Sequence, residues 1–269
     1  MLVSYLPPGM VRWCGRQQFE HPVLGPLIRM GARLIRSGTA KIQHGPGKDL
    51  LIDASLGFSG YALGTTEPEE QAALQNMLNA GDIFWNVGAN IGFHTILGAR
   101  FVGPSGRVVA FEPAPEIAAM IGKNARLNHF EHVTVVQKAV SDKTGKAHLY
   151  LGDASAVNTI LADRSSGGSR VEVDCVTLDD YFKEAGHTPN VISIDVEGAE
   201  LQVLMGSLTL LSMHRPCILL ELHWCQKDFY ELYDQYLAKL GYCLFDLRRS
   251  PHHRKLDPVR EHIVISLPR

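Results

Sequence analysis

Ionisable side chains follow two largely apolar segments of the sequence, at positions where a strand would end. Asp195 and Glu197 come directly after segment 190–194, and Glu221 and His223 end segment 216–223. The carboxyl ends of neighbouring parallel strands meet at one edge of a sheet, where ligands bind. Carboxylates and an imidazole gathered there are typical of a reactive site. We therefore expect these four side chains to lie around one ligand.

The stretch WNVGANIGFHT, residues 85–95, reads as a glycine turn between a strand and a helix. Its two glycines, Gly88 and Gly92, are four residues apart. A dinucleotide-binding turn would need glycine where Asn90 and Phe93 stand, and no G-K-S/T sequence follows to form a phosphate-binding loop. The turn is therefore suited to a small ligand without a pyrophosphate.

Glu112 ends the next expected strand. A carboxylate at this place can accept hydrogen bonds from both hydroxyls of a ribose. S-adenosylmethionine has a ribose but no pyrophosphate, so we expect it as the cofactor. The residues of the turn and of the strand ends that are expected to contact it are Gly88, Asn90, Gly92, Glu112 and Asp195.

Alternating strands and helices must position these residues. Apolar runs predict strands at 82–87, 106–112, 132–140, 190–195 and 216–223, with helices at 66–79, 91–102, 115–128, from about 199, and at 226–240. Thr66 and Glu69 predict a capping box at the start of the first helix. Segments 147–151 and 169–176 read as an antiparallel pair, and two strands close the chain. This order is typical of a doubly wound, mostly parallel α/β sheet.

The chain divides into two regions by composition. Residues 1–65 are rich in Pro and Gly and predict a small appendage, with an amphipathic helix at 27–37 and two short strands within 40–55. The appendage could contact the substrate or the second subunit of a homodimer. Residues 66–269 form the main domain, whose loops 152–168 and 248–256 are expected to contact the acceptor, with Asn158 and Thr159 as candidate polar contacts.

Composition excludes several classes of protein. The chain has 269 residues, 45% of them hydrophobic, and a net charge of −2, which gives no electrostatic basis for binding nucleic acid or an anionic membrane. Five scattered cysteines without a C-x-x-C motif argue against a disulfide framework or a zinc cluster. No signal-peptide pattern or apolar span of ~18 residues is found. We therefore expect a soluble, cytoplasmic protein.

Five segments together resemble the FkbM family of S-adenosylmethionine-dependent methyltransferases: WNVGANIGFHT, VVAFEPAPEIAAMIGKNARLN, VQKAVSD, VTLDDY and ISIDVEGAELQVLMGS. The resemblance covers residues 60 to 225. It implies the class I methyltransferase fold, a mostly parallel seven-stranded sheet with an antiparallel last strand. It also implies O-methylation of a hydroxyl on a sugar, glycoside, polyketide or related small molecule. The resemblance further implies cofactor contacts at Asn86 and Val140, and Asn86 departs from the family, which usually has Asp there.

Methyl transfer to a poorly nucleophilic hydroxyl needs a positioned base or a metal ion. Asp195 is the first candidate for the base because its strand ends beside the glycine turn, and His223 is the second. Glu197 and Glu221 would orient the acceptor or the base. The alternative is a Mg²⁺ ion on Asp195 and Glu221, with His223 as a further ligand.

Two other functions remain open at this point. An NAD-type oxidoreductase would share the sheet and the ribose-binding acid, but it would need the two absent glycines. A non-catalytic cofactor-binding protein would keep the fold without the chemistry, and Asn86 is the only residue that hints at it.

Overall fold

The computed structural model describes residue 9 and residues 38–152, 158–161, 169–254 and 260–268. The helix expected at 27–37 lies outside these ranges. No helix within the described ranges is both long and apolar enough to cross a membrane.

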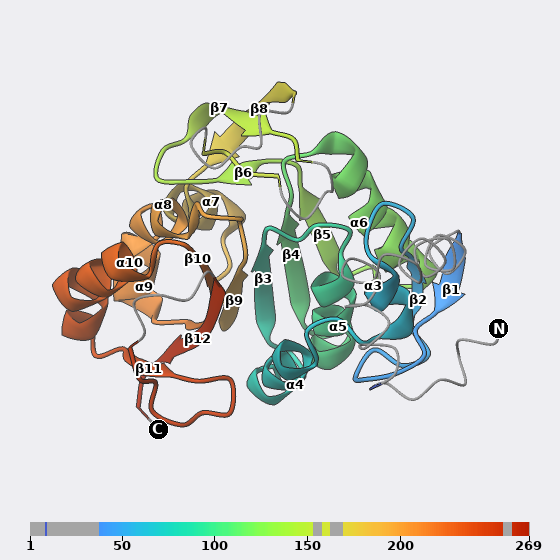
Figure 1. The fold of residues 1–269 in the computed structure, drawn as a ribbon, viewed down its shortest axis with the longest axis horizontal. Helices are drawn as coiled ribbons and strands as arrows, with labels where there is room; N and C mark the ends of the chain where they lie inside the picture. Colours follow the sequence, from blue (N-terminus) through green and yellow to red (C-terminus); the bar gives the residue numbers. More distant parts are fainter. Residues whose placement is uncertain (1–8, 10–37, 153–157, 162–168, 255–259, 269) are drawn as a thin grey trace, which may run out of the picture.

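A seven-stranded sheet forms the centre of the molecule (Figure 1). Its only antiparallel member is the last strand in the sequence, which runs between two parallel neighbours. In spatial order the strands are β11 (Cys243–Phe245), β12 (Arg260–Ser266), β10 (Cys217–His223), β9 (Val191–Ile194), β3 (Ile83–Val87), β4 (Arg107–Phe111) and β5 (Val133–Val136). The strand order reverses between β3 and β9, where ligands bind in such sheets. The expected fold class is confirmed.

Both faces of the sheet are covered, so its strands are apolar on both sides. Phe84 and Trp85 are neighbours in β3, and they pack into two different hydrophobic cores. Figure 1 shows helices on either side of the sheet. One side carries α4 (Pro68–Met77), α5 (Phe93–Val102) and α6 (Pro115–Leu127), and the other carries α7 (Leu178–Ala185), α8 (Glu200–Met205), α9 (Leu208–His214) and α10 (Gln226–Leu232).

The segment expected as a single strand over 132–140 is two strands, and this prediction is wrong. The chain bends after β5, where the Lys138 amide donates to the Val136 carbonyl at 2.8 Å. The remainder forms β6 (Ala139–Val140), which joins β7 (Gly145–Tyr150) and β8 (Arg170–Val176) in a separate three-stranded sheet. The predicted antiparallel pairing of β7 with β8 is confirmed.

The predicted capping box at the start of α4 is also wrong. The N-cap is Glu67 rather than Thr66, it has a left-handed backbone with φ 47°, and it makes no side-chain cap. Its carboxylate instead accepts a hydrogen bond from Arg260 in β12 at 2.6 Å. A tertiary ion pair therefore replaces the local cap, and it aims the first turn of α4 toward the carboxyl end of the sheet.

Two expected helices are interrupted. The one beginning near 199 ends at Gly206, where a side chain would meet the Ser141 carbonyl oxygen at 2.1 Å, and α9 follows. The one expected over 226–240 continues beyond α10 as a π-helical turn (Tyr233–Leu237) and a 3₁₀ turn (Ala238–Leu240).

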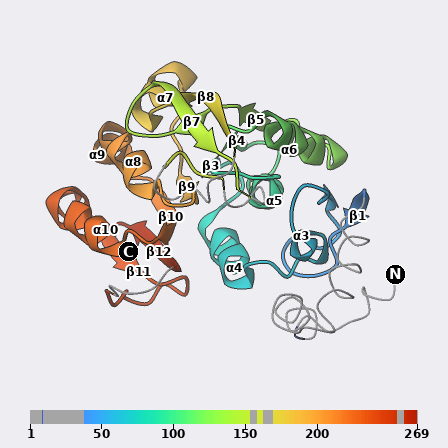
Figure 2. The same cartoon turned by 45° about the horizontal axis from the view of Figure 1, so that its top comes forward.

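The described part of the appendage packs on the main domain. Strands β1 (Thr39–Lys41) and β2 (Leu51–Asp53) pair antiparallel as expected, and α3 (Ser59–Leu63) follows. Asn124 of α6 accepts from the Asp53 amide at 2.7 Å and donates to the Ile91 carbonyl at 2.8 Å. Figure 2 shows α4 between α3 and the strands β10 and β12.

Candidate active site

The glycine turn brings β3 and β9 into very close contact. Gly88 has φ 81°, and a Cβ atom there would meet the Asp195 carbonyl oxygen at 1.7 Å. The Asp195 amide in turn donates to the Val87 carbonyl at 3.0 Å. Only glycine fits this position, because any side chain would collide with the backbone of the other strand end.

Glu112 lies beside the glycine turn and is hydrogen-bonded to it. Its two carboxylate oxygens accept hydrogen bonds from the Asn90 amide at 3.1 Å and the Ala114 amide at 3.0 Å. Burial raises the pKa of this carboxyl to about 7, despite the two amides. The carboxylate is thus positioned beside the turn and is close to its ionisation point at neutral pH.

The other expected cofactor contacts differ in their positions. Asn86 and Val140 line the cavity described below, and the Asn86 side chain donates to Thr95 Oγ1 at 3.0 Å. Gly92 does not line the cavity, because it caps α5 with φ 89° and packs against Ile121. Its role in the described structure is to start the helix.

Asp195 follows β9 and lies beside the glycine turn. Its Oδ1 atom is buried and accepts no hydrogen bond from the described residues. Burial, together with the nearby charge of Glu197, raises the pKa of Asp195 well above its ordinary value. A carboxyl group in this state is a stronger base than an exposed aspartate once it is ionised.

His223 lies at the end of β10 between several acids. Its Nδ1 atom lies 2.9 Å from Glu200, a fully buried carboxylate, and its Nε2 atom lies 3.4 Å from Glu221 and 3.6 Å from Glu197. Burial alone would lower the pKa of His223, but the hydrogen bond to Glu200 and the charge of Asp195 raise it to about 9. The ring is therefore protonated at neutral pH, and Glu200 is its main partner.

Residues that the sequence analysis did not single out complete the site. Arg260 of β12 lies with its Nε atom against Glu221, and His262 Nε2 lies 3.4 Å from the other oxygen of Glu221. His262 Nε2 also lies 2.5 Å from Glu70 Oε1. The register of β10 with β12 explains these contacts, because it pairs Glu221 with His262 and His223 with Arg260.

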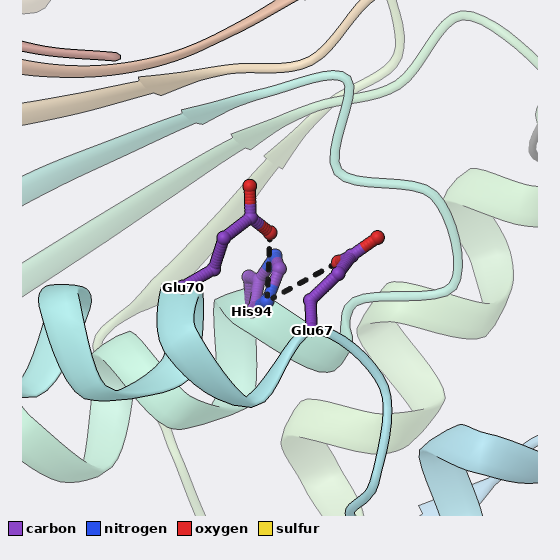
Figure 3. A group of neighbouring side chains, drawn as sticks. All are labelled: Glu67, Glu70 and His94. Atoms are coloured by element: carbon purple, nitrogen blue, oxygen red, sulfur yellow. Dashed lines mark ion pairs between the residues drawn. The ribbon is translucent and has the colours of Figure 1, made fainter. Parts of the chain in front are cut away.

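The first turns of α4 and α5 contribute Glu67, Glu70 and His94, which point toward one another (Figure 3). The two carboxyl groups of this set have different pKa values. Burial and the neighbouring charge of Glu70 raise the pKa of Glu67 to about 7. Burial would also raise the pKa of Glu70, but His262 lowers it to about 2. Glu70 is thus the ionised member of the pair.

A cavity is lined by residues from all of these parts. The candidates from the sequence that line it are Asn86, Gly88, Asn90, Glu112, Val140, Asn158, Thr159, Asp195, Glu197 and Glu221. His223 does not line it, but its Nε2 atom lies 3.4 Å from Glu221. Glu67, Glu70, His94 and Arg260 also line it.

Three groups of side chains within the described ranges have the ligand types and spacing for a metal ion. One is the expected group of Asp195, Glu221 and His223. The others are Glu70 with Glu221 and His262, and Glu67 with Glu70 and His94; in each, the ligand atoms lie within 4.8 Å of one another.

Comparisons with known proteins found sequences and structures that are similar to this chain. Residues 86–245 match the methyltransferase FkbM domain family. The 31-O-demethyl-FK506 methyltransferase FkbM of Streptomyces tacrolimicus is 34% identical over 159 residues, covering 48% of this chain and 60% of that protein. The hexuronic acid methyltransferase AglP of Haloferax volcanii is 31% identical over 127 residues, covering 46% of this chain and 49% of that protein. The chain thus spans 60% or less of the length of these relatives.

Among solved structures, the methyltransferase FkbM of Methylobacillus flagellatus KT aligns with a TM-score of 0.47 and 18% identity. That alignment covers 77% of this chain and 52% of the other chain.

Proposed function

The chain belongs to the FkbM methyltransferase family, and from this premise we propose that it transfers a methyl group from S-adenosylmethionine to a hydroxyl of a small molecule. The acceptor class we infer is a sugar, a glycoside or a polyketide. Two relatives support this class: one is a 31-O-demethyl-FK506 methyltransferase and the other a hexuronic acid methyltransferase. The observation that carries the proposal is Asp195 Oδ1, a buried carboxylate oxygen beside the glycine turn with no hydrogen-bond partner among the described residues.

The residues around the turn fit the cofactor. Gly88 lines the cavity where the methionine part would pass, and Glu112 offers a carboxylate to the ribose hydroxyls. S-adenosylmethionine supplies an electrophilic methyl group when bound. The acidic wall of the cavity favours its positive charge, because Asp195, Glu197 and Glu221 all face that space.

We assign the proton transfer to Asp195. The pKa of His223 is raised to about 9, so its ring carries a proton at neutral pH and cannot accept another. Asp195 can accept the hydroxyl proton on Oδ1, and a positive charge in the cavity would favour its ionised form. His223, held by Glu200, keeps Glu221 and Glu197 in place.

Positioning would supply much of the rate, since displacement needs the acceptor oxygen in line with the methyl carbon at ~3–3.5 Å. The cavity wall opposite the glycine turn is built from α4, α5 and β12, which bring Glu70, His94 and Arg260. These polar groups can hold an acceptor by its other oxygens.

Two measurements test this function. Calorimetric titration with S-adenosylmethionine and with NAD separates a methyltransferase from an NAD-type oxidoreductase, and we expect saturable binding of the first alone. A screen of sugar, glycoside and polyketide hydroxyls with a labelled methyl donor then identifies the acceptor. Tight cofactor binding without turnover on any acceptor would favour the non-catalytic alternative.

A further inference from the structure

The group formed by Glu67, Glu70 and His94 takes no part in the proton transfer assigned to Asp195. Glu67 is the N-cap of α4, Glu70 lies three residues later in its first turn, and His94 lies in the first turn of α5. In Figure 3 the imidazole points toward both carboxylates, and Nε2 lies 3.8 Å from Glu67 Oε2 and 3.9 Å from Glu70 Oε2.

These separations suit a shared ion better than direct hydrogen bonds. A hydrogen bond would bring the heavy atoms to ~2.7–3.2 Å. Two atoms bound at ~2.1 Å to one metal ion are at most ~4.2 Å apart. The Nε2 atom of His94 is buried and makes no hydrogen bond with the described residues. It therefore lacks the partner that a buried ring nitrogen requires.

The second oxygen of each carboxylate is already held. Arg260 Nη2 lies 2.6 Å from Glu67 Oε1, and His262 Nε2 lies 2.5 Å from Glu70 Oε1. Each carboxylate thus keeps Oε2 directed at His94. Outer partners of this kind orient the ligands of metal ions in proteins.

The cavity around this group is lined by more acidic than basic side chains. Six acids line the cavity, and among the described lining residues only Arg260 and Lys138 carry a fixed positive charge. Glu70 is 5% exposed, and its Oε2 atom lies 3.9 Å from His94 Nε2, beyond hydrogen-bond distance. Buried carboxylates are costly unless a cation compensates them.

The group expected from the sequence, Asp195 with Glu221 and His223, is less suited to a metal. Arg260 already lies against Glu221, and Glu200 lies 2.9 Å from Nδ1 of His223, whose Nε2 atom lies near both Glu221 and Glu197. The Nε2 atom of His94, by contrast, is buried and has no hydrogen-bond partner among the described residues.

We propose that Glu67, Glu70 and His94 bind a divalent transition-metal ion, such as Mn²⁺ or Zn²⁺, in the wall of the cofactor cavity. A mixed carboxylate and imidazole set favours these ions over Mg²⁺, which prefers oxygen ligands. Three protein ligands leave at least one coordination position open. All three residues line the cavity, so that position can take an oxygen of the acceptor. Only this last role rests on the proposed function; metal binding does not.

The test measures Mn²⁺ binding to the metal-stripped full chain by calorimetry and by electron paramagnetic resonance. We expect saturable binding of about one ion per chain, with a nitrogen coupling in the pulsed spectrum. Glu67→Gln, Glu70→Gln and His94→Ala should each weaken the affinity by more than tenfold, and His94→Ala should remove the nitrogen coupling. Circular dichroism and S-adenosylmethionine binding verify that each variant is folded.

Two control variants match the ligands in type but not in position. Glu69→Gln changes an exposed carboxylate in the same helical turn, and His148→Ala removes an exposed histidine of β7. Both should bind Mn²⁺ like the parent. The proposal is overturned if the parent binds no Mn²⁺ saturably, or if folded ligand variants keep parental affinity. It is also overturned if Asp195→Asn weakens binding while His94→Ala does not, since the ion then lies at the other group.

Discussion

At the scale of single residues, environment rather than residue type separates the roles of the acids in this cavity. Glu112 is held by two amides, Asp195 is buried beside a backbone contact with one oxygen unpaired, and Glu200 is fully buried against a histidine. Three carboxyl groups can therefore bind a ribose, accept a proton and orient a ring. Each assignment leads to a separate measurement.

Replacing Glu112 with alanine should weaken S-adenosylmethionine binding at least tenfold. The variant loses charged-acceptor hydrogen bonds, which contribute about 1.5–3 kcal/mol each. Isothermal titration calorimetry checks this, with Glu116→Ala as the control because Glu116 is an exposed acid on α6. Parental affinity in Glu112→Ala would show that the cofactor is placed wrongly.

The affinity for S-adenosylmethionine should depend on pH through Glu112. The pKa of this carboxyl is raised to about 7, so it is mostly neutral below that pH in the free protein. Only the ionised form accepts from both ribose hydroxyls, so affinity should fall as pH drops below 7, by up to ~10-fold per unit, and level off above it. Glu112→Gln cannot ionise and should show a flatter profile between pH 5 and 8. An equal slope in both proteins would assign the effect to another group.

Asp195→Asn should lower kcat by ~10²-fold or more, which is the range for loss of a general base. Asparagine keeps the shape but cannot accept the proton. Cofactor affinity and the fold should largely survive, which calorimetry and thermal unfolding can verify. Asp228→Asn, an exposed aspartate of α10, is the control. If Asp195→Asn turned over like the parent, Asp195 would not be the base, and another group of the cavity would have to accept the proton.

At the scale of elements, the site depends on two strand ends whose backbones lie so close together that no side chain fits between them. Gly88 and the Asp195 backbone are in contact where β3 and β9 end, and β12 brings Arg260 and His262 against β10. Helices α4 and α5 direct their first turns at the same point. These elements together position the site, and the glycine turn is where a substitution should disturb it most.

Gly88→Ala should destabilise the protein and abolish cofactor binding. The new Cβ would meet the Asp195 carbonyl oxygen at 1.7 Å, and the φ of 81° is itself unfavourable for alanine. Gly186→Ala separates these causes, because Gly186 has φ 67° with no atom within 4 Å of the added Cβ. We expect a loss of about 1 kcal/mol from the control and a clearly larger loss from Gly88→Ala in urea unfolding. Equal losses would mean that the close contact has no energetic effect.

At the scale of the whole molecule, the described part of the appendage is joined to the domain through polar bonds as well as apolar packing. Asn124 is fully buried, and it links β2 to the loop before α5 by bonding Asp53 and Ile91. Lys123 adds an ion pair with Asp53. Asn124 therefore holds the β1–β2 hairpin and the segment that follows the glycine turn together.

Asn124→Ala should lower the free energy of unfolding by about 2–4 kcal/mol, because it leaves more than one buried backbone group unpaired at ~1–3 kcal/mol each. The control is Asn79→Ala, an exposed position after α4, for which a change within ~0.5 kcal/mol is expected. Urea unfolding at constant slope measures both. Matching free energies for the two variants would contradict a joining role for Asn124.

Local pattern in the sequence was sufficient for the sheet, the glycine turn and the acids at the strand ends. Alternating apolar periods specify strands and helices directly, and a strand that ends in Asp or Glu places that side chain at the carboxyl edge whatever lies next to it. Asn86, Gly88, Glu112, Asp195 and Glu221 were found in this way, and all of them line the cavity. The fold class followed from the same pattern and from the family resemblance.

Only the tertiary structure decided which residues face those acids. The capping-box pattern at Thr66 failed because Glu67 pairs with Arg260, 193 positions away, and no local pattern contains such a partner. His262 meets Glu221 through the register of an antiparallel pair, and His94 meets Glu67 and Glu70 because two helices begin at one point. Burial lowers the pKa of His94, whereas the hydrogen bond to Glu200 and the charge of Asp195 raise the pKa of His223 despite burial. Long-range pairing and desolvation depend on the packed chain, so the sequence identified the acids of the cavity but not their partners.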